Sequence, residues 1–266
     1  MSGHLLSLAS GVLPEFSPEQ TAAAAIAAGW PAVGIWVEPS TWTAATAAEV
    51  RARTRDAGTV VLDVEVVWLK PGADDPDHLR IIDTGATIDA RNVLVVSSDP
   101  DPQSSADKLR RLCEHAADRA MRVCLEFAAF TEIASLAAAL DVISRTNHPA
   151  AGLLIDPLHF ARTGATPAML QGVDPRLLPY AQFCDAAALG PLPQDVPAII
   201  EEALDLRLDI ATGGLPLRAL IDALPSAIPL SIELRSRALR DGFADPAERA
   251  AALLAATRSG MAVLQR

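Results

Sequence analysis

Short apolar runs alternate with helical segments from one end of this chain to the other. Eight of the runs have the length and composition of β-strands, at 5–10, 32–37, 59–69, 92–98, 122–127, 151–156, 180–185 and 229–234. Strands that alternate with helices predict a parallel sheet whose crossovers are helical. With eight strands, closure into a barrel leaves no unpaired strand edge. The pattern therefore predicts an α/β fold built as a closed (β/α)8 barrel.

The helix boundaries fit the same arrangement. Ser17 is a favourable N-cap, Pro18 suits the first helical position, and Gly29 ends that helix. Helices are expected at 17–29, 43–57, 76–90, 103–120, 131–145, 216–224 and 246–261, with shorter ones near 167–171 and 195–204. An open doubly wound sheet is the alternative, but 9–11 lack the glycine-rich turn typical of it. We therefore expect a single TIM barrel, one domain over residues 1–266.

Composition and charge exclude several classes of function. The net charge of −11 argues against a nucleic-acid partner, because binding phosphates needs a basic face. No apolar run approaches the roughly 18 residues that a membrane helix needs, and the start of the chain lacks the basic region of a signal peptide. The three cysteines form no CxxC pair and are odd in number, so a disulfide framework is not expected. These features predict a cytoplasmic protein without nucleic-acid or membrane partners.

Oxygen-bearing side chains follow four successive strands in the second half of the chain. These are Glu126, Asp156, Gln182 and Glu233. In a (β/α)8 barrel the C-terminal strand ends form one face, which carries the catalytic groups. Three carboxylates so close together repel one another unless a cation neutralises them. Oxygen donors favour one divalent ion such as Mn²⁺, Mg²⁺ or Co²⁺, with Zn²⁺ as an alternative.

The motifs around these strand ends resemble a known family. They are Leu125-Glu126, Ile155-Asp156-Pro157-Leu158-His159, Ala181-Gln182-Phe183-Cys184-Asp185 and Ser231-Ile232-Glu233-Leu234-Arg235. The sequence resembles the xylose-isomerase-like barrels of the sugar isomerase, epimerase and AP-endonuclease-2 superfamily over its whole length. The resemblance implies that Glu126, Asp156, Gln182 and Glu233 bind the metal, and that His159 contacts substrate oxygens. It also implies a small polyhydroxy carbonyl compound as substrate.

The resemblance is divided between branches of that superfamily. Some of its epimerases carry a second Glu six residues after the first, and Glu132 stands there. Those epimerases have His on strand seven and Arg six residues later, where this chain has Gln182 and Ala188. A glutamine on strand seven, here Gln182, is more similar to the pattern of the dehydratases, such as 3-dehydroshikimate and inosose dehydratases. Glu132 is thus a candidate substrate-binding residue.

The expected chemistry begins with loss of a proton next to a carbonyl. A metal that chelates a carbonyl and its neighbouring hydroxyl acidifies this proton and stabilises the enediolate. Glu126 and Glu233 lie on opposite sides of the ligand ring and are the expected acid/base pair, with His159 beside them. Arg235 shares the strand phase of Glu233 and should lie at the pocket rim. Trp68 and Lys70 close the third strand and could line the pocket.

Four functions compete at this stage. An isomerase or epimerase of a sugar or sugar-like hydroxyketone is preferred, and a metal-dependent dehydratase is the first alternative. A barrel that only binds a small ligand is the second. An AP-endonuclease-like activity needs a histidine-rich metal cluster and a basic groove, which five scattered histidines and the acidic charge do not favour. The sequence leaves the oligomeric state open, with a homodimer as one alternative.

Overall fold

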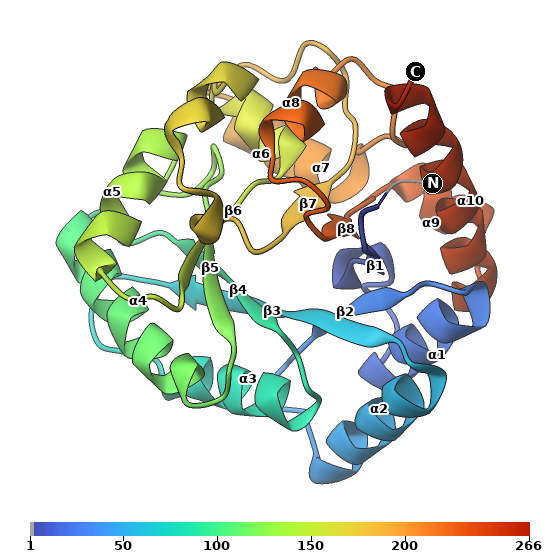
Figure 1. Ribbon diagram of the computed structural model, residues 1–266, viewed down its shortest axis with the longest axis horizontal. Coiled ribbons are helices and arrows are strands. Elements are labelled where there is room, and N and C mark those ends of the chain that lie inside the picture. Colours follow the sequence, from blue (N-terminus) through green and yellow to red (C-terminus); the bar gives the residue numbers. More distant parts are fainter. Residues whose placement is uncertain (1–2) are drawn as a thin grey trace.

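The protein is an eight-stranded parallel barrel surrounded by helices (Figure 1). This computed structural model describes residues 3–266. The strands are β1 (Leu6–Leu8), β2 (Ala32–Trp36), β3 (Val60–Leu69), β4 (Asn92–Ser97), β5 (Arg122–Glu126), β6 (Ala151–Leu154), β7 (Ala181–Phe183) and β8 (Leu230–Ile232). They pair in the order β6-β5-β4-β3-β2-β1-β8-β7. A single parallel bridge between Ile155 and Ala181 joins β6 to β7. The predicted single (β/α)8 TIM barrel is confirmed.

Ten helices cover the outside of the barrel within the described residues (Figure 1). They are α1 (Pro18–Ala28), α2 (Ala44–Ala57), α3 (Pro76–Thr87), α4 (Pro102–Ala117), α5 (Leu136–Thr146), α6 (Pro157–Arg162), α7 (Val196–Asp205), α8 (Leu217–Ala223), α9 (Arg237–Gly242) and α10 (Pro246–Leu264). Short 3-10 helices are η1 (Ser10–Val12), η2 (Pro167–Gly172) and η3 (Pro175–Leu177). Most helices begin at a side-chain cap followed by proline, as Ser17 and Pro18 illustrate for α1. None of the helices within residues 3–266 is both long and apolar enough to cross a bilayer.

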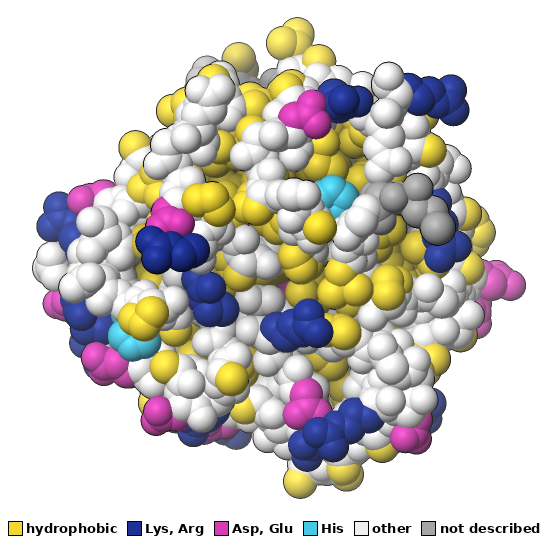
Figure 2. All heavy atoms as spheres, in the orientation of Figure 1, with side chains coloured by type: hydrophobic (Ala, Val, Ile, Leu, Met, Phe, Trp, Pro, Cys, Tyr) yellow, Lys and Arg dark blue, Asp and Glu magenta, His cyan; other side chains and the backbone are white. Residues whose placement is uncertain are grey.

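The main apolar core lies between the strands and the helices. Its residues point outward from the strands and inward from the helices, as Val33, Val93 and Leu253 do. Trp30 is fully enclosed here, and its Nε1 donates to the carbonyl of Ala250, 2.9 Å away, which ties α1 to α10. On the face shown in Figure 2, acidic and basic side chains are interspersed around the rim and apolar atoms gather toward the middle.

One helix begins later than the sequence predicts. The helix after β5 was expected from Thr131 but starts at Leu136, because Ser135 caps it by accepting from the backbone N–H of Ala138. Thr131 instead forms a turn, in which its Oγ1 donates to the carbonyls of Ala128 and Ile133. Glu132 is therefore an exposed turn residue, not a first-turn helix acid.

The inside of the barrel holds a buried carboxyl group that the strand pattern does not predict. Between Val33 and Gly34 the register of β2 and β3 shifts by one residue, so that Asp63 pairs with Gly34. A Cβ on Gly34 would lie 3.1 Å from one Asp63 oxygen and 3.2 Å from the other, so glycine makes room for this carboxyl. Neither oxygen has a hydrogen-bond partner among the described residues. Burial and the nearby charge of Glu65 raise the pKa of Asp63 well above its ordinary value.

This raised pKa leads to a prediction about stability. The folded protein keeps a proton on Asp63 that the unfolded chain releases near its ordinary pKa, so the contribution of Asp63 to stability is lost as pH rises above that value. Asp63→Asn cannot ionise, so we expect the variant to be more stable than the parent at pH 8. The difference in unfolding free energy between variant and parent should shrink toward pH 4, with a slope of at most about 1.4 kcal/mol per pH unit. Denaturant unfolding of both proteins between pH 4 and 8 measures it, and a variant that is less stable at pH 8 would contradict it.

Candidate metal centre

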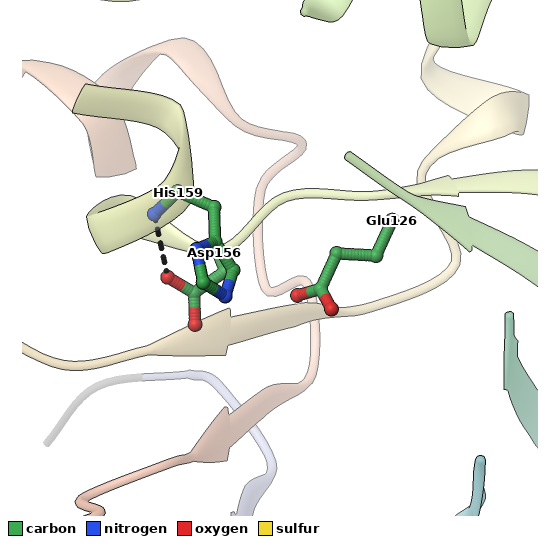
Figure 3. Close-up of side chains that lie close together, drawn as sticks. All are labelled: Glu126, Asp156 and His159. Atoms are coloured by element: carbon green, nitrogen blue, oxygen red, sulfur yellow. Dashed lines mark hydrogen bonds between the residues drawn. The ribbon is translucent and has the colours of Figure 1, made fainter. Parts of the chain in front are cut away.

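The four candidate ligands meet at the C-terminal end of the barrel. Glu126 is the last residue of β5, Gln182 lies in β7, and Glu233 directly follows β8. Asp156 follows β6 and caps α6, where its Oδ1 accepts from the backbone N–H of His159 at 3.1 Å (Figure 3). All are buried, between 1% and 6% exposed. Alternate residues of parallel strands face the barrel interior, which is why the strand pattern predicts that these four side chains lie together.

The polar groups of this cluster lie close enough together to bind one ion. The Gln182 amide bridges Glu126 Oε1 at 2.9 Å and Glu233 Oε2 at 3.1 Å, and its nitrogen donates to both carboxylates. Ligand atoms of Glu126, Asp156 and His159 also lie within 4.8 Å of one another, and Figure 3 shows the Glu126 carboxyl group pointing toward Asp156 and His159. The donor set therefore fits one hard divalent ion.

The Gln182 amide distinguishes two states of the site. In the orientation that satisfies its hydrogen bonds, the amide nitrogen donates to Glu126 and Glu233. Turned by 180°, the amide would present its oxygen to a cation held between the two carboxylates. The same side chain can therefore serve as a ligand with a cation or as a donor without one.

Arg207 is a part of the site that the sequence analysis missed. It follows α7, and its guanidinium is 2% exposed. Nη1 donates to Asp156 Oδ2, and Nη2 lies 2.7 Å from Glu233 Oε2. Nε donates to the carbonyl of Ala203 at 2.8 Å, which fixes the side chain. Arg207 thus supplies positive charge directly beside two of the candidate ligands.

Burial and mutual repulsion shift the pKa values of the carboxyl groups. Burial, with the charges of Asp156 and Glu233, raises the pKa of Glu126 well above its ordinary range. Burial also raises the pKa of Glu233 to about 7, although Arg207 works against it. For Asp156 burial acts in the same direction, but Arg207 and His159 outweigh it, so its pKa is lowered. The cluster thus favours partial neutralisation, which a bound cation or Arg207 can supply.

His159 is held as a neutral ring. Burial lowers its pKa to about 4. Its ring packs edge-on against Phe130, with the ring centres 5.4 Å apart. Nε2 lies 3.4 Å from Nη2 of Arg207, and because a guanidinium can only donate, Nε2 must accept and the ring proton belongs on Nδ1. Orientation by Arg207 and Phe130 therefore fixes this side chain beside Asp156.

A cavity of about 260 Å³ opens above the cluster. Glu126, His159 and Glu233 line it, together with Trp68 and Arg235 as the sequence predicts. Arg235 Nε lies 3.3 Å from Glu233 Oε1, and its guanidinium rests on Gly11, where a Cβ would approach Nε to 2.4 Å.

Two predicted substrate-binding residues lie outside the lining of this cavity. Glu132 is in the exposed turn after β5. Lys70 is exposed after β3, and its carbonyl accepts from Lys108. The binding roles of both residues stay predictions.

The profile of the xylose isomerase-like TIM barrel family matches residues 22–259 of the sequence. The chain belongs to the xylose isomerase-like TIM-barrel family. This confirms the resemblance inferred from the motifs at the strand ends. A comparison with curated proteins finds no match.

Several solved structures share this xylose isomerase-like fold. The IolI protein with a bound zinc atom is similar over 97% of both chains, with a TM-score of 0.79 and 15% identity. D-psicose 3-epimerase from Clostridium cellulolyticum H10, solved with D-tagatose, covers 96% of this chain and 98% of its own, with a TM-score of 0.67 and 13% identity. A xylose isomerase-like TIM barrel/4-hydroxyphenylpyruvate dioxygenase fusion protein covers 95% of this chain, with a TM-score of 0.79 and 22% identity. This chain spans 42% of the length of that fusion protein. At these identities the likeness shows the fold.

Proposed function

We propose that this chain is a divalent-metal-dependent isomerase or epimerase of a sugar or sugar-like hydroxyketone. The observation that carries the proposal is the meeting of buried ligand atoms of Glu126, Asp156 and His159, all within 4.8 Å of one another, beside a cavity that Glu126 and His159 line. The zinc atom in IolI and the activity named for D-psicose 3-epimerase support it. Mn²⁺, Mg²⁺ and Co²⁺ are the proposed ions, with Zn²⁺ as an alternative.

The side chains of the site have two proposed roles, cation binding and proton transfer. Glu126, Asp156, Gln182 and Glu233 would hold the cation. When bound, a divalent cation would polarise a carbonyl and its neighbouring hydroxyl and so acidify the carbon-bound proton between them. Glu126 on β5 and Glu233 after β8 are separated by β6 and β7 around the barrel wall, so one carboxylate can take this proton while the other returns one. His159 would hold a substrate oxygen in the cavity that it lines.

The site also supports a second candidate, a dehydratase of the 3-dehydroshikimate or inosose type. Return of the proton to the neighbouring carbon isomerises the substrate, and return to the opposite face epimerises it. Loss of a β-hydroxyl after the same first step dehydrates it. Gln182 on β7 favours the dehydratase, because the related epimerases are expected to have His there.

Proton exchange in deuterated water tests this proposal. Chelator-treated protein, with and without added Mn²⁺, would be incubated with ketoses and hydroxyketo acids and followed by NMR and mass spectrometry. We expect deuterium next to the carbonyl only with Mn²⁺, and a loss of at least about a hundredfold in Glu126→Gln. Conserved substrate mass identifies an isomerase or epimerase, and loss of water identifies a dehydratase.

The surface variant Glu49→Gln is the matched control, because Glu49 is about half-exposed on α2 and its ion pair among residues 3–266 is with Arg53. It should exchange protons as the parent does. A protein that binds Mn²⁺ but exchanges no proton on any compound would be a ligand-binding barrel, and the proposal would fail.

A further inference from the structure

The cavity above the candidate ligands has a polar floor and apolar walls. Glu126, His159, Arg207 and Glu233 form the floor. Large apolar side chains form most of the walls, namely Trp36, Trp68, Phe130, Ile200 and Leu204. Hydroxyl groups pressed against such walls would lose hydrogen bonds to water without replacement. A small molecule with hydroxyls on every carbon therefore fits the floor but not the walls.

Four of the five wall residues are exposed although they are large and apolar. Trp36, the last residue of β2, is 43% exposed, and Trp68 of β3 is 39% exposed. Ile200 and Leu204, one turn apart on α7, are 38% and 42% exposed. The indole Nε1 of Trp68 donates to Ser98 Oγ at 2.9 Å, which steadies the ring. A contiguous apolar surface of this kind at the mouth of a site is typical of a ligand contact.

A second chamber continues from this wall. It measures about 700 Å³ between the loops after β1 and β2, and it shares Trp36 and Arg235 with the first cavity. Glu15, Glu19 and Glu38 line it beside Arg235, and Glu15 pairs with Arg249 at 2.6 Å, so the lining carries charges of both signs. The two chambers together provide room beyond the candidate metal ligands for a further uncharged group.

We infer that the substrate has two parts, a hydroxyketone that binds on the polar floor and an uncharged ring with an apolar face that rests on Trp36 and Trp68. The inference rests on the proposed function for its first part. A flat ring suits indole faces because stacked or edge-on rings gain energy beyond the area they bury.

A matched pair of hydroxyketones tests the inference. Hydroxyacetone and 2-hydroxyacetophenone both carry a carbonyl beside a hydroxyl, but only the second carries a ring. Their affinities for Mn²⁺-loaded protein would be measured by calorimetry. We expect 2-hydroxyacetophenone to bind at least about tenfold more tightly. Trp36→Ala and Trp68→Ala should each reduce the ratio of the two affinities, 2-hydroxyacetophenone over hydroxyacetone, toward one.

The control is Val263→Ala, because Val263 is 53% exposed near the end of α10, outside both chambers. It should leave the ratio unchanged. A ratio within twofold of one in the parent, or a ratio that survives both tryptophan variants, would overturn the inference. Deuterium exchange at the CH₂OH carbon, followed in the same samples, tests the proposed function separately. A preserved ratio without exchange leaves the ring site standing and rejects the enzyme.

Discussion

Replacing Glu233 with alanine should remove the bound cation and reduce turnover by at least about a thousandfold. Glu233 is 5% exposed, and its Oε2 accepts from the Gln182 amide at 3.1 Å, so its loss removes both a proposed ligand and a proposed proton carrier from the centre of the cluster. Elemental analysis after reconstitution with Mn²⁺ and the deuterium exchange rate measure the two effects. The parent should hold about one ion per chain, and Glu233→Ala should hold far less.

Glu49→Ala is the matched control, since it removes a glutamate from the outside of α2. It should keep the ion and the rate. If Glu233→Ala kept about one ion per chain and a rate within tenfold of the parent, Glu233 would be neither ligand nor base. The carboxyl cluster would then have a structural role.

Removal of Arg207 should destabilise the metal-free protein by about 3–5 kcal/mol, because it leaves the buried Asp156 without its counter-charge and Glu233 with the Arg235 contact at 3.3 Å alone. The guanidinium pairs with Asp156 and Glu233, and all three side chains are almost completely buried. In saturating Mn²⁺ the cation should neutralise the same carboxylates, so the destabilisation should become smaller. Denaturant unfolding of Arg207→Met and parent, each with chelator and with Mn²⁺, measures both values.

A second buried ion pair in the same protein provides the control. Arg162 lies 2.6 Å from Glu202, and their side chains are 8% and 7% exposed. This pair joins α6 to α7 and is not part of the cavity lining. Arg162→Met should therefore lose similar stability, but by the same amount with and without Mn²⁺. If Arg207→Met lost the same stability with chelator and with Mn²⁺, the ion would bind elsewhere.

The barrel and its four strand-end oxygens could be predicted from the sequence because both depend on local periodicity. Alternation along each strand decides which side chains point inward, and parallel strands bring their ends to one face. Arg207 could not be found in this way. It lies in the long connection after β7, and only the folding of α7 brings it 51 residues back along the chain to Asp156.

Departures from regular geometry explain the other differences. A register shift between β2 and β3 allows Asp63 to face Gly34, and a sequence pattern that assumes perfect alternation does not show such a shift. α5 starts late because Ser135 caps it, while Thr131 forms a turn before it through a hydrogen bond to the carbonyl of Ala128. Both depend on interactions among neighbouring segments, not on the propensity of any one residue.

The seam between β6 and β7 gives the candidate ion a mechanical consequence. The one bridge across it, Ile155 to Ala181, directly precedes Asp156 and Gln182, which stand on opposite sides. An ion bound by both side chains would link β6 to β7 at a junction where the main chains are paired by a single bridge. Binding of the ion would then make local opening of the barrel wall rarer. Amide hydrogens beside this junction would be the first to gain protection from hydrogen exchange.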